Sequence, residues 1–159
     1  MSDGSVLITE YARGTIVRVD GNDWSNRTDI ATGLSGPAMM KLGLDGSLYV
    51  GERTGGRISR LNPESGELTV IAQGLAGPEG FDIAPDGRII VAEVGAKRIS
   101  AIDMADGKTR VLKSGLPIGF EAPDGAPDLY IPTGVAVAAN GDIYYSSDID
   151  VAIYRLKKN

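Results

Sequence analysis

The sequence contains no cysteine and no histidine among its 159 residues. The first absence excludes disulfide bonds, thiolate nucleophiles and thiolate metal sites. The second excludes Ser-His-Asp and Cys-His catalytic arrangements, together with zinc sites that use imidazole ligands. Any catalysis must therefore use carboxylates, lysine, tyrosine or hydroxyl groups, or a hard cation bound by oxygen atoms.

Positive charge and long apolar runs are also scarce. Lys and Arg number 16 against 21 Asp and Glu, which gives a formal net charge of −5. An acidic chain without a basic patch is a poor partner for nucleic acid or for an anionic membrane surface. No apolar run reaches the length of a membrane span, and the first residues lack the features of a signal peptide. We expect a soluble, cytoplasmic protein.

Glycine, by contrast, is abundant, and it marks an internal repeat. Residues 77–99 serve as the template, with apolar runs at 81–84 and 89–92 on either side of a Pro-Asp-Gly turn. Short apolar runs separated by such turns predict antiparallel strands. Three copies align through the opening prolines Pro37, Pro78 and Pro132 and the turn glycines Gly46, Gly87 and Gly141.

A period near 40–45 residues with four strands per unit is typical of a propeller blade. We predict a single domain over 1–159, with blade units at about 1–35, 36–76, 77–131 and 132–159. The first unit lacks an innermost strand and the last lacks an outermost strand. The predicted fold is all-β, a partial β-propeller of four-stranded antiparallel blades, two complete and two incomplete.

These motifs resemble the six-bladed propellers of the NHL-repeat and gluconolactonase (senescence-marker-protein, lactonase-like) superfamily. The likeness rests on Gly77-Pro78-x-Gly80, Pro85-Asp86-Gly87, Ile90-Val91-Ala92-Glu93 and the closing stretch 141–155, and it covers about half a ring. Gluconolactonase-like members hold a divalent cation, commonly Ca²⁺, at the channel mouth. The resemblance implies an Asn or Asp ligand after the opening proline of some blades, where this chain has Ala38, Glu79 and Thr133.

Glu79 is the strongest candidate for chemistry, because its counterparts in the other blades are not acidic. The resemblance places Glu79 as metal ligand or general base, with Thr133 in a second metal position. The alternative is a solvated carboxylate in a turn. Asp82 follows on the same predicted strand, but it faces the other way unless a bulge intervenes.

Two other groups of carboxylates have open interpretations. Glu10, Glu52 and Glu93 recur just past one strand of each unit, with Ser147 in the fourth place. They either gather a cation or, as we favour, accept backbone N–H hydrogen bonds from the turn that follows the strand in their own blades. The loop 115–131 carries Glu121, Asp124 and Asp128, which either act as a lid with oxygen ligands or keep the loop hydrated.

An incomplete ring leaves apolar sheet exposed on its terminal blades. A small four-bladed ring, a piece of a longer protein and a pair of half-rings all resolve this problem, and we expect a homodimer. Two functions remain open. The first is a divalent-metal-dependent hydrolase of a small lactone or ester bound in the channel. The second is a non-enzymatic NHL-like propeller that serves as a binding or assembly module.

Overall fold

The computed structural model describes residues 3–121 and 133–158 of the chain. These residues form four antiparallel sheets and one turn of 3₁₀ helix, η1, at Val94–Ala96. Each sheet is one blade, and the blades contain these strands: blade 1, β1 (Val6–Glu10), β2 (Thr15–Val19) and β3 (Arg27–Ala31); blade 2, β4 (Pro37–Leu42), β5 (Leu48–Glu52), β6 (Arg57–Leu61) and β7 (Leu68–Gln73); blade 3, β8 (Pro78–Ile83), β9 (Ile89–Glu93), β10 (Arg98–Ile102) and β11 (Thr109–Ser114); blade 4, β12 (Val135–Val137), β13 (Ile143–Ser147) and β14 (Ala152–Leu156).

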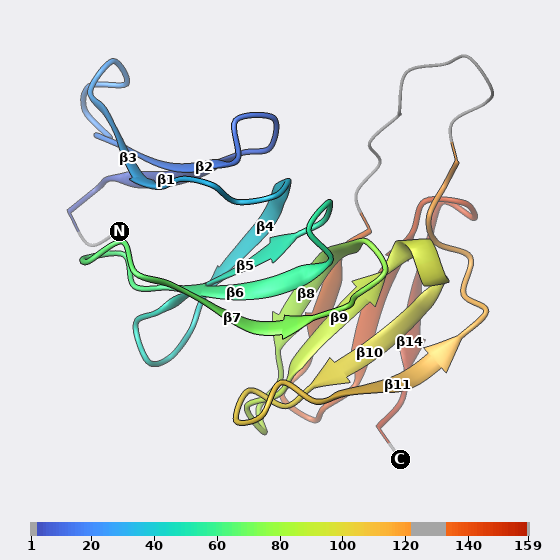
Figure 1. The fold of residues 1–159 in the computed structure, drawn as a ribbon. Helices are drawn as coiled ribbons and strands as arrows, with labels where there is room; N and C mark the ends of the chain where they lie inside the picture. The colour runs from blue at the N-terminus through green and yellow to red at the C-terminus, as the bar shows by residue number, and fades with distance from the viewer. Residues whose placement is uncertain (1–2, 122–132, 159) are drawn as a thin grey trace.

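The blades fan around one side of a common axis (Figure 1). Within each blade the strands pair in chain order, and the inner strands β4, β8 and β12 contact one another in sequence. Strand β1 contacts the inner strand of the next blade, β4, as β5 contacts β8. Because β5 is the second strand of blade 2, β1 corresponds to a second strand, and blade 1 has no innermost strand among the described residues. The structure confirms the predicted partial propeller, with two complete and two incomplete blades in the described part of the chain.

Three apolar cores hold adjacent blades together. Ile16, Ile58 and Ile99 occupy the same place on β2, β6 and β10, and each is fully buried against the next blade. Burying an isoleucine side chain contributes about 1.5–3 kcal/mol, so these residues help to fix the blades to each other. Ile153 takes this place on β14 and is 77% exposed. The outer face of blade 4 therefore has the chemistry of a blade interface without a neighbour among the described residues.

The turn that precedes each of these strands contains a residue in the left-handed region, namely Gly14, Gly56, Lys97 and Val151. The carbonyls of the first three accept a hydrogen bond from the leucine that begins the linker to the next blade. Val151 has a φ of 53°, although β-branched residues are disfavoured there. Its side chain is 91% exposed, so the strain is not offset by packing.

Replacing this valine with glycine should therefore stabilise the protein. Val151→Gly is expected to raise the free energy of unfolding by about 0.5–1 kcal/mol, because relief of left-handed strain outweighs the added freedom of the unfolded chain. Urea unfolding measures the change. The converse substitution, Gly56→Val, should destabilise, since a Cβ at Gly56 lies 2.6 Å from the Leu75 carbonyl oxygen. A loss of stability in Val151→Gly would contradict this assignment of strain.

Candidate functional site

Strand β8 carries a bulge between Pro78 and Phe81. The extra residue changes the alternation of side chains, so Glu79 and Asp82 reach the same neighbouring blades. Both carboxylates are buried, and both accept a backbone N–H from blade 4. From the sequence we expected these two side chains to lie on opposite faces of the strand unless a bulge was present. The bulge is present, and it explains why both carboxylates reach blade 4.

Glu79 is the centre of a network near the start of β8 (Pro78–Ile83). One carboxylate oxygen accepts a hydrogen bond from Arg53 Nε at 2.9 Å, and the other accepts the Thr133 backbone N–H at 2.9 Å. Burial alone lowers the pKa of Arg53, but hydrogen bonds with Tyr11 and Glu79 raise it overall. Tyr11, Arg53, Glu79 and Thr133, which we call the mouth network, come from blades 1 to 4 in order. The network therefore ties every blade to its neighbour.

Asp82 makes the corresponding connection at the other end of β8. One of its oxygens pairs with the Lys41 ammonium of blade 2, and the other accepts the Val137 backbone N–H of blade 4 at 2.8 Å. The ion pair and the hydrogen bond offset the cost of burying this carboxylate. Asp82 and Glu79 thus act as two braces along the same inner strand.

The repeated carboxylates Glu52 and Glu93 lie inside their own blades and have no exposed surface. Each receives a two-nitrogen contact from an arginine on the next strand, Arg57 or Arg98, at 2.7–2.8 Å. A serine hydroxyl of the same blade also donates to each carboxylate, Ser59 to Glu52 and Ser100 to Glu93. A backbone N–H of the linker that leads into the blade donates as well, from Ser35 to Glu52 and from Ala76 to Glu93. The structural interpretation of these residues is supported. The N–H group belongs to the linker into the blade, whereas we expected it in the following turn.

The two end blades vary this arrangement. Glu10 of blade 1 pairs with Arg13 and Arg27 at the surface. Ser147 of blade 4 donates to the Pro117 carbonyl and accepts the Asp150 N–H. The residue at this repeat position therefore joins the end of its strand to nearby residues of the chain. It does so with a fully buried carboxylate only in the two complete blades.

The buried carboxylates predict how stability depends on pH. Burial alone raises the pKa of Glu52 and Glu93, but the arginine, serine and backbone hydrogen bonds lower it overall from the ordinary 4.5. A lowered folded-state pKa stabilises the protein above the unfolded-state pKa, and this contribution is lost as pH falls toward the folded value. We expect a constant urea midpoint from about pH 7 to 5.5 and a decline below about pH 4.5. The double variant Glu52→Gln/Glu93→Gln should show a shallower decline, and an equally steep one would refute this origin.

The loop after β11 is held down where it begins. The Asp148 carboxylate accepts the backbone N–H groups of Gly119 and Phe120 at 3.0 and 2.6 Å. Glu121 is highly exposed and lies 3.9 Å from Lys97. Asp124 and Asp128 lie outside the described residues, so a lid role for them stays a prediction.

The described residues fit a bound Ca²⁺ poorly. Calcium takes six to eight oxygen ligands, whereas both Glu79 oxygens are engaged and the Arg53 cation lies beside one of them. Within 3–121 and 133–158, no three acidic side chains come close enough to share a metal ion. Thr133 Oγ1 is the one buried side-chain polar atom without a hydrogen-bond partner among these residues.

Sequence reasoning missed Arg53 and Tyr11, which complete the mouth network. Tyr11 directly follows β1 and Arg53 directly follows β5, so each comes one residue after the repeated carboxylate Glu10 or Glu52. Arg53 comes directly after Glu52, so its position in the turn was readable from the sequence. Its contact with Glu79 depends on the packing of blade 2 against blade 3 and was not.

Comparison with known proteins places the architecture among β-propellers. No family model matches the sequence. No curated protein sequence matches it either. Solved structures do match: virginiamycin B lyase from Staphylococcus aureus (17% identity, TM-score 0.67, 99% of this chain and 53% of that one), a nidogen/laminin complex (19%, 0.71, 97% and 56%) and a putative gluconolactonase (21%, 0.67, 96% and 56%).

These similarities define the class of protein. The chain has a β-propeller fold and spans about half the length of the solved structures that it matches. The matched proteins include a lyase, a putative lactonase and a member of a protein–protein complex, and at this level of identity they share the fold alone. The described residues contain no helix with the length and hydrophobicity needed to cross a bilayer.

Proposed function

We propose that this chain is a non-enzymatic propeller module that binds other polypeptide. The observation that carries the proposal is the state of Glu79, whose two oxygens are both engaged by other blades. A general base or metal ligand needs a lone pair directed at the reacting group or the cation. Glu79 instead neutralises Arg53 and anchors Thr133, which is the work of a brace between blades.

The outer face of blade 4 offers a surface on which the proposed binding can take place. Ile153 is exposed where its three counterparts are buried in cores between blades. Ile153 therefore provides an apolar contact for a further blade or for another polypeptide. Self-association into a closed ring stays a prediction, and it is one way to cover this face.

A hydrolase is the competing function, because the propellers that this chain resembles include a putative gluconolactonase. The proposal predicts that the purified chain hydrolyses simple sugar lactones no faster than buffer containing the same Ca²⁺ or Mn²⁺. A titrimetric assay at constant pH measures the released acid. Metal-dependent hydrolysis that disappears in Glu79→Gln, while a matched Glu121→Gln variant retains it, would overturn the proposal.

A further inference from the structure

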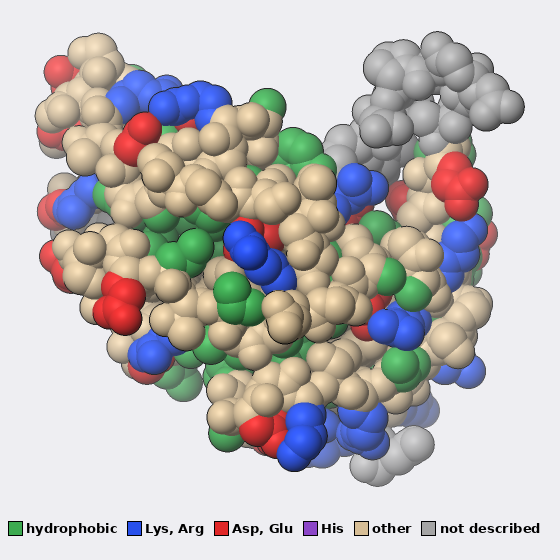
Figure 2. Space-filling view, viewed as in Figure 1, with side chains coloured by type: hydrophobic (Ala, Val, Ile, Leu, Met, Phe, Trp, Pro, Cys, Tyr) green, Lys and Arg blue, Asp and Glu red, His purple; other side chains and the backbone are tan. Residues whose placement is uncertain are grey.

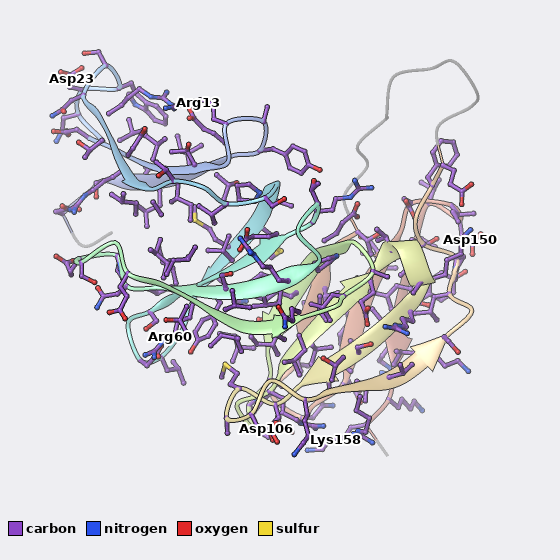
Figure 3. All side chains as sticks on the ribbon, viewed as in Figure 1. Arg13, Asp23, Arg60, Asp106, Asp150 and Lys158 are labelled. Atoms are coloured by element: carbon purple, nitrogen blue, oxygen red, sulfur yellow. The ribbon has the colours of Figure 1, made fainter. Side chains whose placement is uncertain are left out.

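Methionine is the only residue type in this chain that contains sulfur, because cysteine is absent. The described residues include Met39, Met40 and Met104, and each is partly buried against a core between two blades. Figure 3 shows sulfur atoms, drawn in yellow, between the ribbons of neighbouring blades. Oxidation converts a methionine thioether reversibly into a polar sulfoxide. The chain therefore carries oxidisable groups where its blades meet.

Met39, on the inner strand β4, makes a polar contact across a blade boundary. Its Sδ accepts a hydrogen bond from the Phe81 backbone N–H at 3.4 Å. Phe81 ends the bulge in β8, and its side chain is fully buried in the core that also contains Tyr49. A thioether is a weak acceptor, so a chemical change at the sulfur disturbs this contact easily.

The Met39 contact lies between two ion pairs that also join blade 2 to β8, which are Arg53–Glu79 and Lys41–Asp82. We call these three contacts the joint between blades 2 and 3. Met39 and Lys41 belong to β4, and Arg53 directly follows β5, the strand that pairs with β4. A movement of β4 away from β8 therefore lengthens all three contacts together.

We propose that Met39 is a site of reversible oxidation by peroxide, and that this modification loosens the joint between blades 2 and 3. A lone pair of the sulfur attacks one oxygen of hydrogen peroxide, the O–O bond breaks, and the proton on the transferred oxygen passes to the departing hydroxide. The sulfur is oxidised to a sulfoxide, and the peroxide is reduced to water.

The position of Met39 gives the oxidation both access and an effect. Met39 is only partly buried, and Figure 2 shows hydrophobic side chains, in green, that reach the surface among polar ones. The added oxygen either displaces the sulfur from the Phe81 N–H or lies against the apolar core, where an unpaired polar atom is unfavourable. Both arrangements move β4 away from β8. This inference does not depend on the proposed binding function.

Limited treatment of the whole chain with hydrogen peroxide tests the inference. Peptide mass spectrometry measures the oxidised fraction of each methionine, and thermal unfolding measures Tm on the same samples. We expect Tm to fall by several degrees as the oxidised fraction of Met39 rises, with faster hydrogen exchange in β8. Methionine sulfoxide reductases for both sulfoxide epimers, supplied with a thiol reductant, should restore the starting Tm.

Matched variants identify the methionine responsible. Met39→Leu conserves volume without an oxidisable sulfur and should lose at least about half of the peroxide-induced fall in Tm. Met104→Leu, at a methionine that packs against the same core, should retain the fall. Met39→Gln places a polar group where the sulfoxide would form and should lower Tm without peroxide.

Three results overturn the inference. The first is a folded chain in which Met104 is oxidised and Met39 is not. The second is a Tm that stays constant while Met39 is oxidised, which the wild-type chain reveals even if Met39→Leu does not fold. The third is an equal fall in Met39→Leu and in the wild type.

Discussion

Replacing Glu93 with alanine is expected to lower the free energy of unfolding by about 3–5 kcal/mol. Glu93 has no exposed surface, and its removal leaves the Arg98 guanidinium, the Ser100 hydroxyl and the Ala76 N–H without their acceptor. An uncompensated charge close to the core is among the most costly single changes. Urea unfolding followed by circular dichroism measures the loss.

Glu10 provides the matched control, because it occupies the same repeat position in blade 1. Its side chain is 22% exposed and pairs with exposed arginines, and ion pairs at the surface contribute about 0–1 kcal/mol. Glu10→Ala should therefore cost less than about 1 kcal/mol. Similar losses in the two variants would show that burial of the carboxylate does not decide its contribution.

Replacing Gly80 with alanine is the second large effect, with an expected loss of about 3 kcal/mol. A Cβ at this position would lie 2.1 Å from the Thr133 carbonyl oxygen and 2.9 Å from Gly134 Cα. These are backbone atoms, so β8 and β12 must separate, and the hydrogen bond from Thr133 to Glu79 stretches with them. Thermal and urea unfolding measure the change.

Gly134→Ala is the control on the facing segment, one residue before β12. The nearest atom to its added Cβ is the Ser146 hydroxyl at 3.5 Å, which is an ordinary contact. We expect a change within about 0.5 kcal/mol. If Gly80→Ala is tolerated as well as Gly134→Ala, the close approach of blades 3 and 4 that supports the mouth network is wrong.

The repeat made the fold readable from the sequence. Glycine-containing turns and alternating runs locate the strands locally, so the apolar runs at 81–84 and 89–92 overlap β8 and β9. A structural role for Glu52 and Glu93 followed from the same logic, because a residue repeated in every unit usually serves the unit, whereas their burial and their arginine partners did not. Local spacing was sufficient wherever the interaction stays within one blade.

Contacts between blades were not readable in the same way. The bulge in β8 decides where Asp82 points, and Gly80 is a residue type compatible with a bulge but does not by itself establish one. Arg53 reaches Glu79 across 26 positions of sequence and a blade boundary, so its role depends on how two blades pack.

Thermal unfolding of the wild-type chain and of Glu79→Gln, each with and without Ca²⁺ or Mn²⁺, tests most directly whether Glu79 braces the blades. A brace predicts that the metals leave the wild-type Tm unchanged and that Glu79→Gln lowers it by several degrees in every condition, because Arg53 loses its charged partner. A Tm that rises with added metal in the wild type, and not in Glu79→Gln, would contradict the account and identify Glu79 as a metal ligand.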